Sequence, residues 1–197
     1  MESKGYNRQG ELFNRSELFG NFKGENKEVF IKKELIINWQ QRIYTYQKKL
    51  FHGFDSEVNQ FSMFPEEKDL LIQNLKILEL TCLPINFWKS SEKYHDGPAI
   101  YFVTDTLKDG KSNIVLYIGE TISANTRWKG EHDCKKYIEN YQESLTLNQI
   151  KSKINIRFSL DVPKKTKARR KLEQTLIQNW LPPFNKESRH YWQTPFI

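Results

Sequence analysis

Four residue types that can act together on a phosphate group occur in the second half of the chain. Tyr101 and Tyr117 stand in two apolar runs, and Arg127 follows ten residues after Tyr117. Glu173 and Asn185 come later. The planar guanidinium of an arginine can pair with two phosphate oxygens at once. A carboxylate held at the edge of a core suits Mg²⁺, which prefers oxygen ligands and keeps several waters. These residues could together hold a divalent cation and a phosphate ester.

The segments around the tyrosines predict the strands that carry them. AIYFVTD (99–105) and NIVLYIGE (113–120) are rich in β-branched and aromatic residues, and they flank Asp109-Gly110, which is a hairpin signal. KINIRFSLDV (153–162) alternates apolar and polar residues as a third strand would. Gly119 is expected to let the second strand turn sharply, so that its backbone comes close to a ligand.

Two helices are expected to flank these strands, one from Ser123 to about Gln142 and one from Thr166 to the residue before Pro182. The predicted fold is therefore α+β, with a small three-stranded antiparallel sheet flanked by helices. Glu173 falls beside the apolar stripe of the second helix and should be held at the core edge. The alternative for Glu173 is an ion pair within its own helix, with Arg169 or Arg170.

The first half of the chain is expected to form a helical extension. Residues 1–27 are polar and irregular and are interpreted as an arm, whereas 28–93 should contain two helices, over 28–51 and 64–82, that pack together and against the rest. The segment 90–98 would be a short tether. The residues predicted to face inward are Ile31, Leu35, Trp39, Ile43, Tyr46, Leu50, Leu70, Leu71, Asn74, Leu75, Leu78 and Cys82.

Positive charge is concentrated in the second half of the chain. Residues 1–96 contain 14 Lys and Arg and 14 Asp and Glu, a net charge of zero, whereas residues 97–197 contain 17 and 10, a net charge of +7. A localised surplus of this kind is typical of proteins that bind a phosphate backbone, although a merely solvated basic surface would look the same. The stretch 163–171 alone carries six Lys and Arg.

Several function classes are excluded on composition. No segment has the 18 to 20 apolar residues that a membrane span needs, and the first residues lack the apolar stretch of a signal peptide, so a cytoplasmic protein with no membrane partner is expected. Cys82 and Cys134 have neither a CxxC spacing nor a histidine at ligand spacing. Both are expected to be reduced thiols rather than zinc ligands or a disulfide.

Five segments in order, over residues 97–187, resemble the GIY-YIG nuclease superfamily. GPAIYFV and LYIGET resemble the paired strand motifs, SANTRW the arginine helix, RRKLEQTLIQNW the glutamate helix and LPPFN the closing asparagine motif. The chain departs from the family where Ala99 replaces the usual glycine and where the link between the tyrosines is longer. It departs again where Glu131 takes the position of a frequent His or Tyr, with His132 one residue later.

The resemblance implies a site and a mechanism. Tyr101 would orient or deprotonate the attacking water with support from Tyr117, and closeness to Arg127 and a metal would lower the pKa of the phenols. Arg127 would stabilise the transition state, its alternative being a salt bridge with Glu131. Glu173 would bind Mg²⁺ or Mn²⁺. The full predicted catalytic set is Tyr101, Tyr117, Arg127, His132 as candidate proton acceptor, Glu173 and Asn185.

The implied function is a metal-dependent DNA endonuclease. A type II restriction endonuclease is one candidate, a homing or structure-specific repair nuclease is another, and a catalytically degenerate nucleic-acid-binding protein is the rival from a different class. DNA is the expected partner, and a homodimer on DNA is one way to cut both strands. The tail 188–197 could stack on bases or fold back on the core. The residues expected to grip DNA are Lys129, Lys135, Lys164, Lys165, Lys167, Arg169, Arg170 and Lys186.

Overall fold

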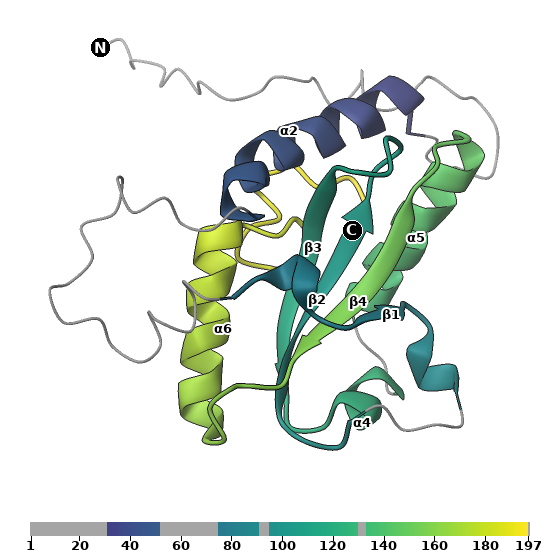
Figure 1. Ribbon diagram of the computed structural model, residues 1–197. Helices are drawn as coiled ribbons and strands as arrows, with labels where there is room; N and C mark the ends of the chain where they lie inside the picture. Colours follow the sequence, from purple (N-terminus) through teal and green to yellow (C-terminus); the bar gives the residue numbers. More distant parts are fainter. Residues whose placement is uncertain (1–30, 52–74, 91–94, 130–132, 197) are drawn as a thin grey trace, which may run out of the picture.

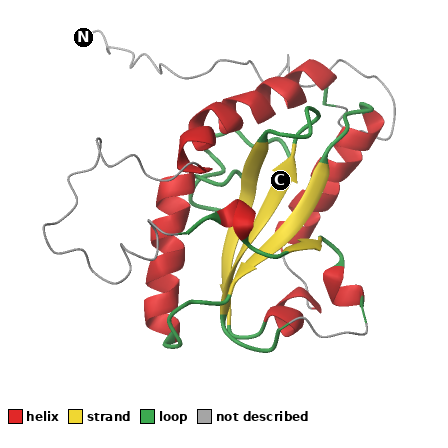
Figure 2. Ribbon diagram, viewed as in Figure 1, coloured by secondary structure: helices red, strands yellow, loops and turns green. Residues whose placement is uncertain are grey.

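Four antiparallel strands form the sheet at the centre of the molecule (Figures 1 and 2). The computed structural model describes residues 31–51, 75–90, 95–129 and 133–196. The strands are β1 (Cys82–Pro84), β2 (Ala99–Thr106), β3 (Asn113–Thr121) and β4 (Lys153–Ser159), in the order β1-β4-β2-β3. The α+β class is confirmed, but the sheet has one strand more than the three predicted.

The additional strand β1 comes from a segment that was expected to be helical. Residues 64–74 of that predicted helix lie outside the described residues, whereas from Leu75 the chain forms a single 3₁₀ turn, η1 (Ile77–Glu79), and then β1. The Arg157 guanidinium donates to the carbonyl oxygens of Leu78 and Leu80 at 2.9 and 2.7 Å. Pairing with β4 and these hydrogen bonds override the helical leucine spacing. Leu78 and Cys82, predicted to face inward, are exposed.

The hairpin of β2 and β3 contains a bulge that decides which way Tyr117 points. Val103 pairs with Tyr117 and Thr104 pairs with Val115, so Leu116 is an extra residue on β3. Consecutive residues of a strand normally point to opposite faces, yet Leu116 and Tyr117 both pack against the core that contains Tyr101. The bulge therefore brings Tyr117 to the same face as Tyr101.

Helices cover both faces of the sheet. Helices α2 (Lys33–Phe51) and α5 (Asp133–Leu147) pack on one face, together with the tail residues Trp192 and Phe196, and α6 (Thr166–Trp180) packs on the other (Figure 1). The helix predicted over 123–142 is instead two, α4 (Ala124–Lys129) and α5, on either side of residues 130–132, which lie outside the described residues. Tyr46, predicted to face inward, is 38% exposed, because Gln47 takes the buried position.

Side chains and the tail cover the outer edge of β3. The Gln47 amide bonds both the N–H and the C=O of Val115, and the Asn185 amide bonds both the N–H and the C=O of Ile118. The Phe184 N–H donates to the Leu116 carbonyl. A free strand edge presents unpaired backbone groups, and here helix α2 and the C-terminal segment satisfy them.

A buried carboxyl joins four elements at the other end of β2. The Asp105 carboxylate accepts hydrogen bonds from Tyr141 on α5, at 2.7 Å, and from Ser152 and the Lys153 N–H at the start of β4. Gln40 on α2 donates to the Tyr141 hydroxyl. Burial outweighs these hydrogen bonds and raises the pKa of Asp105 to about 6.

None of the described helices combines the length and apolar character needed to cross a bilayer.

Candidate active site

Two stacked tyrosines lie at the centre of the predicted site. Tyr101 and Tyr117 have ring centroids 6.0 Å apart and planes at 25°. Tyr101 is fully buried, and Trp128 of α4 meets its ring edge-on at 5.5 Å, whereas Tyr117 is half-buried. The two phenols therefore lie side by side, and Tyr117 is the more accessible to solvent.

Gly119 has a role different from the one predicted. It lies within β3, which continues to Thr121, so the expected sharp turn is not there. Gly119 pairs with Tyr101 across the hairpin, and a Cβ atom on Gly119 would overlap the Tyr101 hydroxyl and ring. The glycine is needed because the phenol occupies the space that a side chain would fill.

Burial favours the protonated form of both phenols. Desolvation raises the pKa of Tyr101 well above its usual value, and the opposing influence of Arg127, by charge and by a hydrogen bond, is smaller. Desolvation likewise raises the pKa of Tyr117. Burial thus outweighs the lowering of the pKa that was expected from Arg127, and each hydroxyl keeps its proton at neutral pH. The Tyr101 hydroxyl is hydrogen-bonded to both Arg127 and Tyr117.

Arg127 lies on α4 with its guanidinium close to the tyrosines. Its side chain is exposed and donates a hydrogen bond to the Tyr101 hydroxyl. The negative charge of Glu120 favours the protonated guanidinium. Glu131, the alternative partner, lies outside the described residues, as does His132. Arg127 is thus anchored at one point and still open to an anionic ligand.

Glu173 reaches the end of β3 from helix α6. Its Oε1 accepts a hydrogen bond from the Glu120 N–H at 3.0 Å, and Oε2 accepts none from a described residue. Desolvation raises the pKa of Glu173 to about 7, and the nearby carboxylates of Glu120 and Glu187 add to that rise. Glu120 and Tyr117 belong to the same strand, so this hydrogen bond brings the Glu173 carboxylate to the strand that carries the phenol.

Glu120 is a site residue that the sequence did not single out. Its carboxylate pairs with Arg169 at 2.8 Å and with Arg170 at 3.2 Å. It follows the YIG motif directly, so its position in the motif is the one signal that could have identified it. The pairing places the first turn of α6 against the end of β3, and hence sets where Glu173 lies.

Two of the predicted site residues have other roles. The Arg169 guanidinium is fully buried, bonded to Glu120 and to the carbonyl oxygens of Pro163 and Lys164, so it cannot grip DNA as predicted. Asn185 is buried, and its side-chain amide accepts from the Ile118 N–H and donates to the Ile118 carbonyl. We therefore assign Asn185 a positioning role in place of the predicted catalytic one.

The other predicted DNA contacts lie on the surface. Arg170 is 67% exposed in its side chain, and Lys135 is half-buried with its ammonium 4.6 Å from the Trp88 ring centroid, a cation–π contact. The remaining five are exposed: Lys129, Lys164, Lys165, Lys167 and Lys186.

The donors of the site fit a magnesium ion held by few protein ligands. The described residues contain no group of three or more His, Cys, Asp or Glu that could form a closed metal site. Mg²⁺ is commonly bound by one or two carboxylates, with water and substrate phosphate as the other ligands. Glu173, with Oε2 available, fits this pattern.

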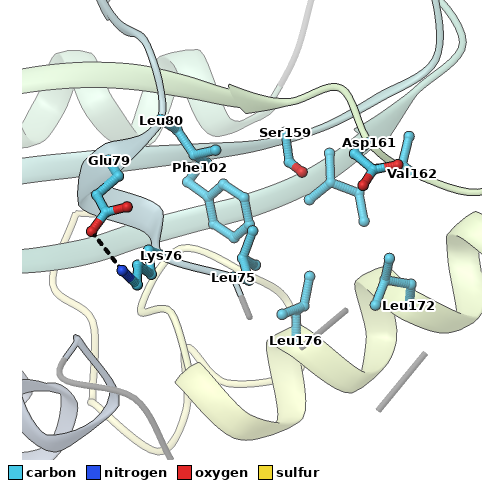
Figure 3. Close-up of a pocket in the computed structure, with 11 residues that line it drawn as sticks. Leu75, Lys76, Glu79, Leu80, Phe102, Ser159, Asp161, Val162, Leu172 and Leu176 are labelled. Carbon is cyan, nitrogen blue, oxygen red and sulfur yellow. Dashed lines mark ion pairs between the residues drawn. The ribbon is translucent and has the colours of Figure 1, made fainter. Parts of the chain in front are cut away.

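A separate cavity of about 460 Å³ lies on the α6 face of the sheet (Figure 3). Phe102 from β2 and Leu172 and Leu176 from α6 form its apolar wall, and the Lys76–Glu79 ion pair stands at its rim. None of the described catalytic candidates lines this cavity. It is therefore distinct from the cluster around Tyr101.

Comparison with known proteins gives no relative: no protein-family model matches the chain, and neither a curated protein nor a solved structure matches it significantly.

Proposed function

We propose that the protein is a metal-dependent DNA endonuclease that hydrolyses phosphodiester bonds, with a site of the GIY-YIG type. The observation that carries the proposal is the position of Tyr117. This phenol stacks on Tyr101, which is hydrogen-bonded to Arg127. Glu173 accepts from the Glu120 N–H, three residues further along the strand that carries Tyr117. Residues that are up to 72 positions apart in sequence thus meet at the end of β3.

Each residue has a role that follows from its surroundings. Arg127 is exposed and can pair with the non-bridging oxygens of the scissile phosphate, where charge develops in the transition state. The protonated phenol of Tyr117 can donate a hydrogen bond to a water or a phosphate oxygen, and Tyr101 orients both Tyr117 and Arg127 through its own hydrogen bonds. Glu173 would hold Mg²⁺ or Mn²⁺, which when bound polarises phosphoryl oxygens and lowers the pKa of bound water.

DNA is the proposed partner because of the charge beside the site. Lys164, Lys165 and Lys167 are exposed at the start of α6, and Arg170 follows them. Each phosphate that such cations neutralise releases counterion, which favours binding at low salt. Restriction, homing and repair enzymes of this class would share this chemistry, and a homodimer that cuts both strands would be compatible with it.

A catalytically inactive nucleic-acid-binding protein is the second candidate. One observation favours it: Tyr101 is completely buried and packs against Trp128, as a tyrosine that only fills a core would. The exposed cations would serve either function, so only an assay of turnover separates the two.

The test is cleavage of long genomic DNA, plasmid and branched DNA with Mg²⁺, with Mn²⁺ and with EDTA. Glu173→Gln should abolish metal-dependent cleavage while DNA affinity stays within about threefold, because the amide can still accept from the Glu120 N–H. The matched control is Glu143→Gln, an exposed carboxylate on α5, which should cleave normally. DNA binding without cleavage by the unmodified protein on every substrate would favour the inactive binder.

A further inference from the structure

A shallow groove of about 850 Å³ lies between helix α2 and the C-terminal tail. None of the residues placed in the proposed active site lines it. The lining combines aromatic rings, amides and a single charged side chain, from Asn38, Gln41, Arg42, Thr45, Tyr46, Tyr191 and Trp192.

The two tyrosine rings of the groove are exposed, and neighbouring groups hold them in place. Tyr191 is 59% exposed, and its ring meets that of Trp192 at a centroid distance of 4.8 Å. The Trp192 indole is buried and donates to the Leu181 carbonyl. The Tyr46 hydroxyl donates to the Asn179 carbonyl at 3.0 Å. Rings fixed in this way lose little conformational entropy when a flat ligand stacks on them.

The charge of the groove favours an anionic ligand. Arg42 is half-buried and forms no ion pair within the part of the chain that the structure describes. None of the seven lining residues is acidic. Helix α2 as a whole carries four Lys and Arg against one Glu, although the first half of the chain is neutral overall. A phosphate would therefore find an unopposed cation beside the rings.

We infer that this groove binds an unpaired nucleotide of single-stranded nucleic acid. A base would stack on Tyr191, and Tyr46, whose ring is tilted 56° from that of Tyr191, would meet its edge. The amides of Asn38 and Gln41 would face the polar edge of the base, and Arg42 would pair with the adjoining phosphate. Base stacking on aromatic side chains tolerates any sequence and contributes roughly 1 to 3 kcal/mol per base. An apolar peptide would leave Arg42 without a counter-charge, so a nucleotide fits the groove better.

The groove is placed to extend the proposed site. Tyr46 is bonded to Asn179, six residues after Glu173 on α6, and six residues of helix span about 9 Å. That is a short distance for an extended strand. As part of a nuclease, the groove would hold unpaired DNA a few nucleotides from the scissile phosphate, and in this respect the inference rests on the proposed function.

Fluorescence anisotropy in EDTA tests the groove without cleavage, with a labelled oligothymidine and a duplex as probes. Tyr191→Ala should weaken single-strand binding roughly 5- to 150-fold, and Tyr191→Phe should keep most of it. Arg42→Gln should lower the slope of log affinity against log salt by about one. Leu147→Ala, which changes an exposed apolar residue of α5, is the control and should bind normally.

Three outcomes would overturn the inference: oligothymidine affinity within twofold of the unmodified protein in both Tyr191→Ala and Arg42→Gln, an equal loss of duplex binding, or no binding of the oligomer to the unmodified protein. The test is separable from the assay of cleavage. If the groove variants bind oligothymidine weakly and the unmodified protein cleaves no DNA, the groove inference holds and the proposed nuclease function fails. If the groove variants bind oligothymidine normally and the unmodified protein cleaves DNA, the groove inference fails and the proposed function holds.

Discussion

The Tyr101 phenol lies against Gly119, directly across the hairpin, in the space that a Cβ atom at Gly119 would take. Tyr101 cannot move away easily, because Trp128 and Phe158 pack on its ring. The size of residue 119 and the position of the phenol are therefore coupled.

Gly119→Ala should displace Tyr101, lower the free energy of unfolding by about 1 to 3 kcal/mol, and reduce cleavage by at least tenfold. Combining it with Tyr101→Phe should recover part of the lost stability, because the hydroxyl is among the atoms that clash. Chemical denaturation and cleavage assays measure the two effects. Gly110→Ala is the control: it lies at φ +70 with open space around it, so it should cost stability but not activity. Full activity in Gly119→Ala would contradict the coupling.

Tyr101→Phe keeps the ring and removes only the hydroxyl that bonds Arg127. We expect cleavage to fall by roughly 10² to 10⁴, while stability changes by about 1 kcal/mol or less. Single-turnover cleavage and thermal unfolding provide the measurements, with Tyr44→Phe on α2 as control. Unimpaired cleavage would assign the orienting role to Tyr117 or to His132.

Arg127→Lys tests whether the planar fork is needed. A lysine keeps the charge but offers a single point of contact, so we expect cleavage to drop more than tenfold while DNA affinity falls by less than threefold. Lys129→Ala, two residues further along α4 and exposed, should weaken binding slightly and leave turnover intact. A lysine variant within tenfold of the unmodified rate would argue against transition-state stabilisation by residue 127.

Arg169 and Arg170 are neighbours, yet substituting them should affect stability to very different degrees. Arg169→Gln leaves a buried site without its charge and should cost on the order of 3 kcal/mol of stability, part of which Glu120→Gln should restore in the double variant. Arg170→Gln should change stability by less than about 1 kcal/mol and should lower the salt dependence of DNA binding. Urea denaturation and salt titrations distinguish the two. Equal stability of the two single variants would mean that the Glu120 pair does not anchor α6.

Because of the buried Asp105 carboxyl, the free energy of unfolding should fall as pH rises. The pKa of Asp105 is about 6 when folded and about 3.9 in an unfolded chain. Between those values the unfolded state releases the proton while the folded state keeps it, so the protein should lose on the order of 3 kcal/mol relative to Asp105→Asn from pH 4 to 6, and no more above that. Asp109, whose pKa is lowered to about 2 by hydrogen bonds in its turn, should show the opposite sign. A pH-independent difference between Asp105→Asn and the unmodified protein would refute the buried titration.

The hairpin was the part of the fold most accessible to sequence reasoning. The β-branched runs and Asp109-Gly110 are local signals, and the structure places β2, the turn and β3 where they indicate. Strand β1 could not be predicted, because it depends on a distant partner, Arg157, and on pairing with β4. The spacing of the leucines in that segment indicates a helix, because spacing carries no information about these long-range contacts.

The candidate site was predictable in residue type but not in detail. The tyrosines and Glu173 do meet, yet the bulge at Leu116 that turns Tyr117 toward Tyr101 leaves no mark in the sequence. Burial also reversed the expected direction of the tyrosine pKa values, because desolvation depends on packing that a motif does not encode. Arg169 shows the same limit, since a run of basic residues does not reveal which one turns inward.

The covering of β3 limits how copies of the chain could associate. Gln47, Asn185 and Phe184 already occupy backbone groups along that margin, so a neighbouring molecule could not extend the sheet there without first displacing the segments that flank the candidate site. The opposite margin is β1, three residues long and ending at Pro84, which has no N–H to donate. Sheet continuation from one molecule to the next is thus disfavoured on both sides, and a dimer that cuts both strands of a duplex would have to form through helices and loops.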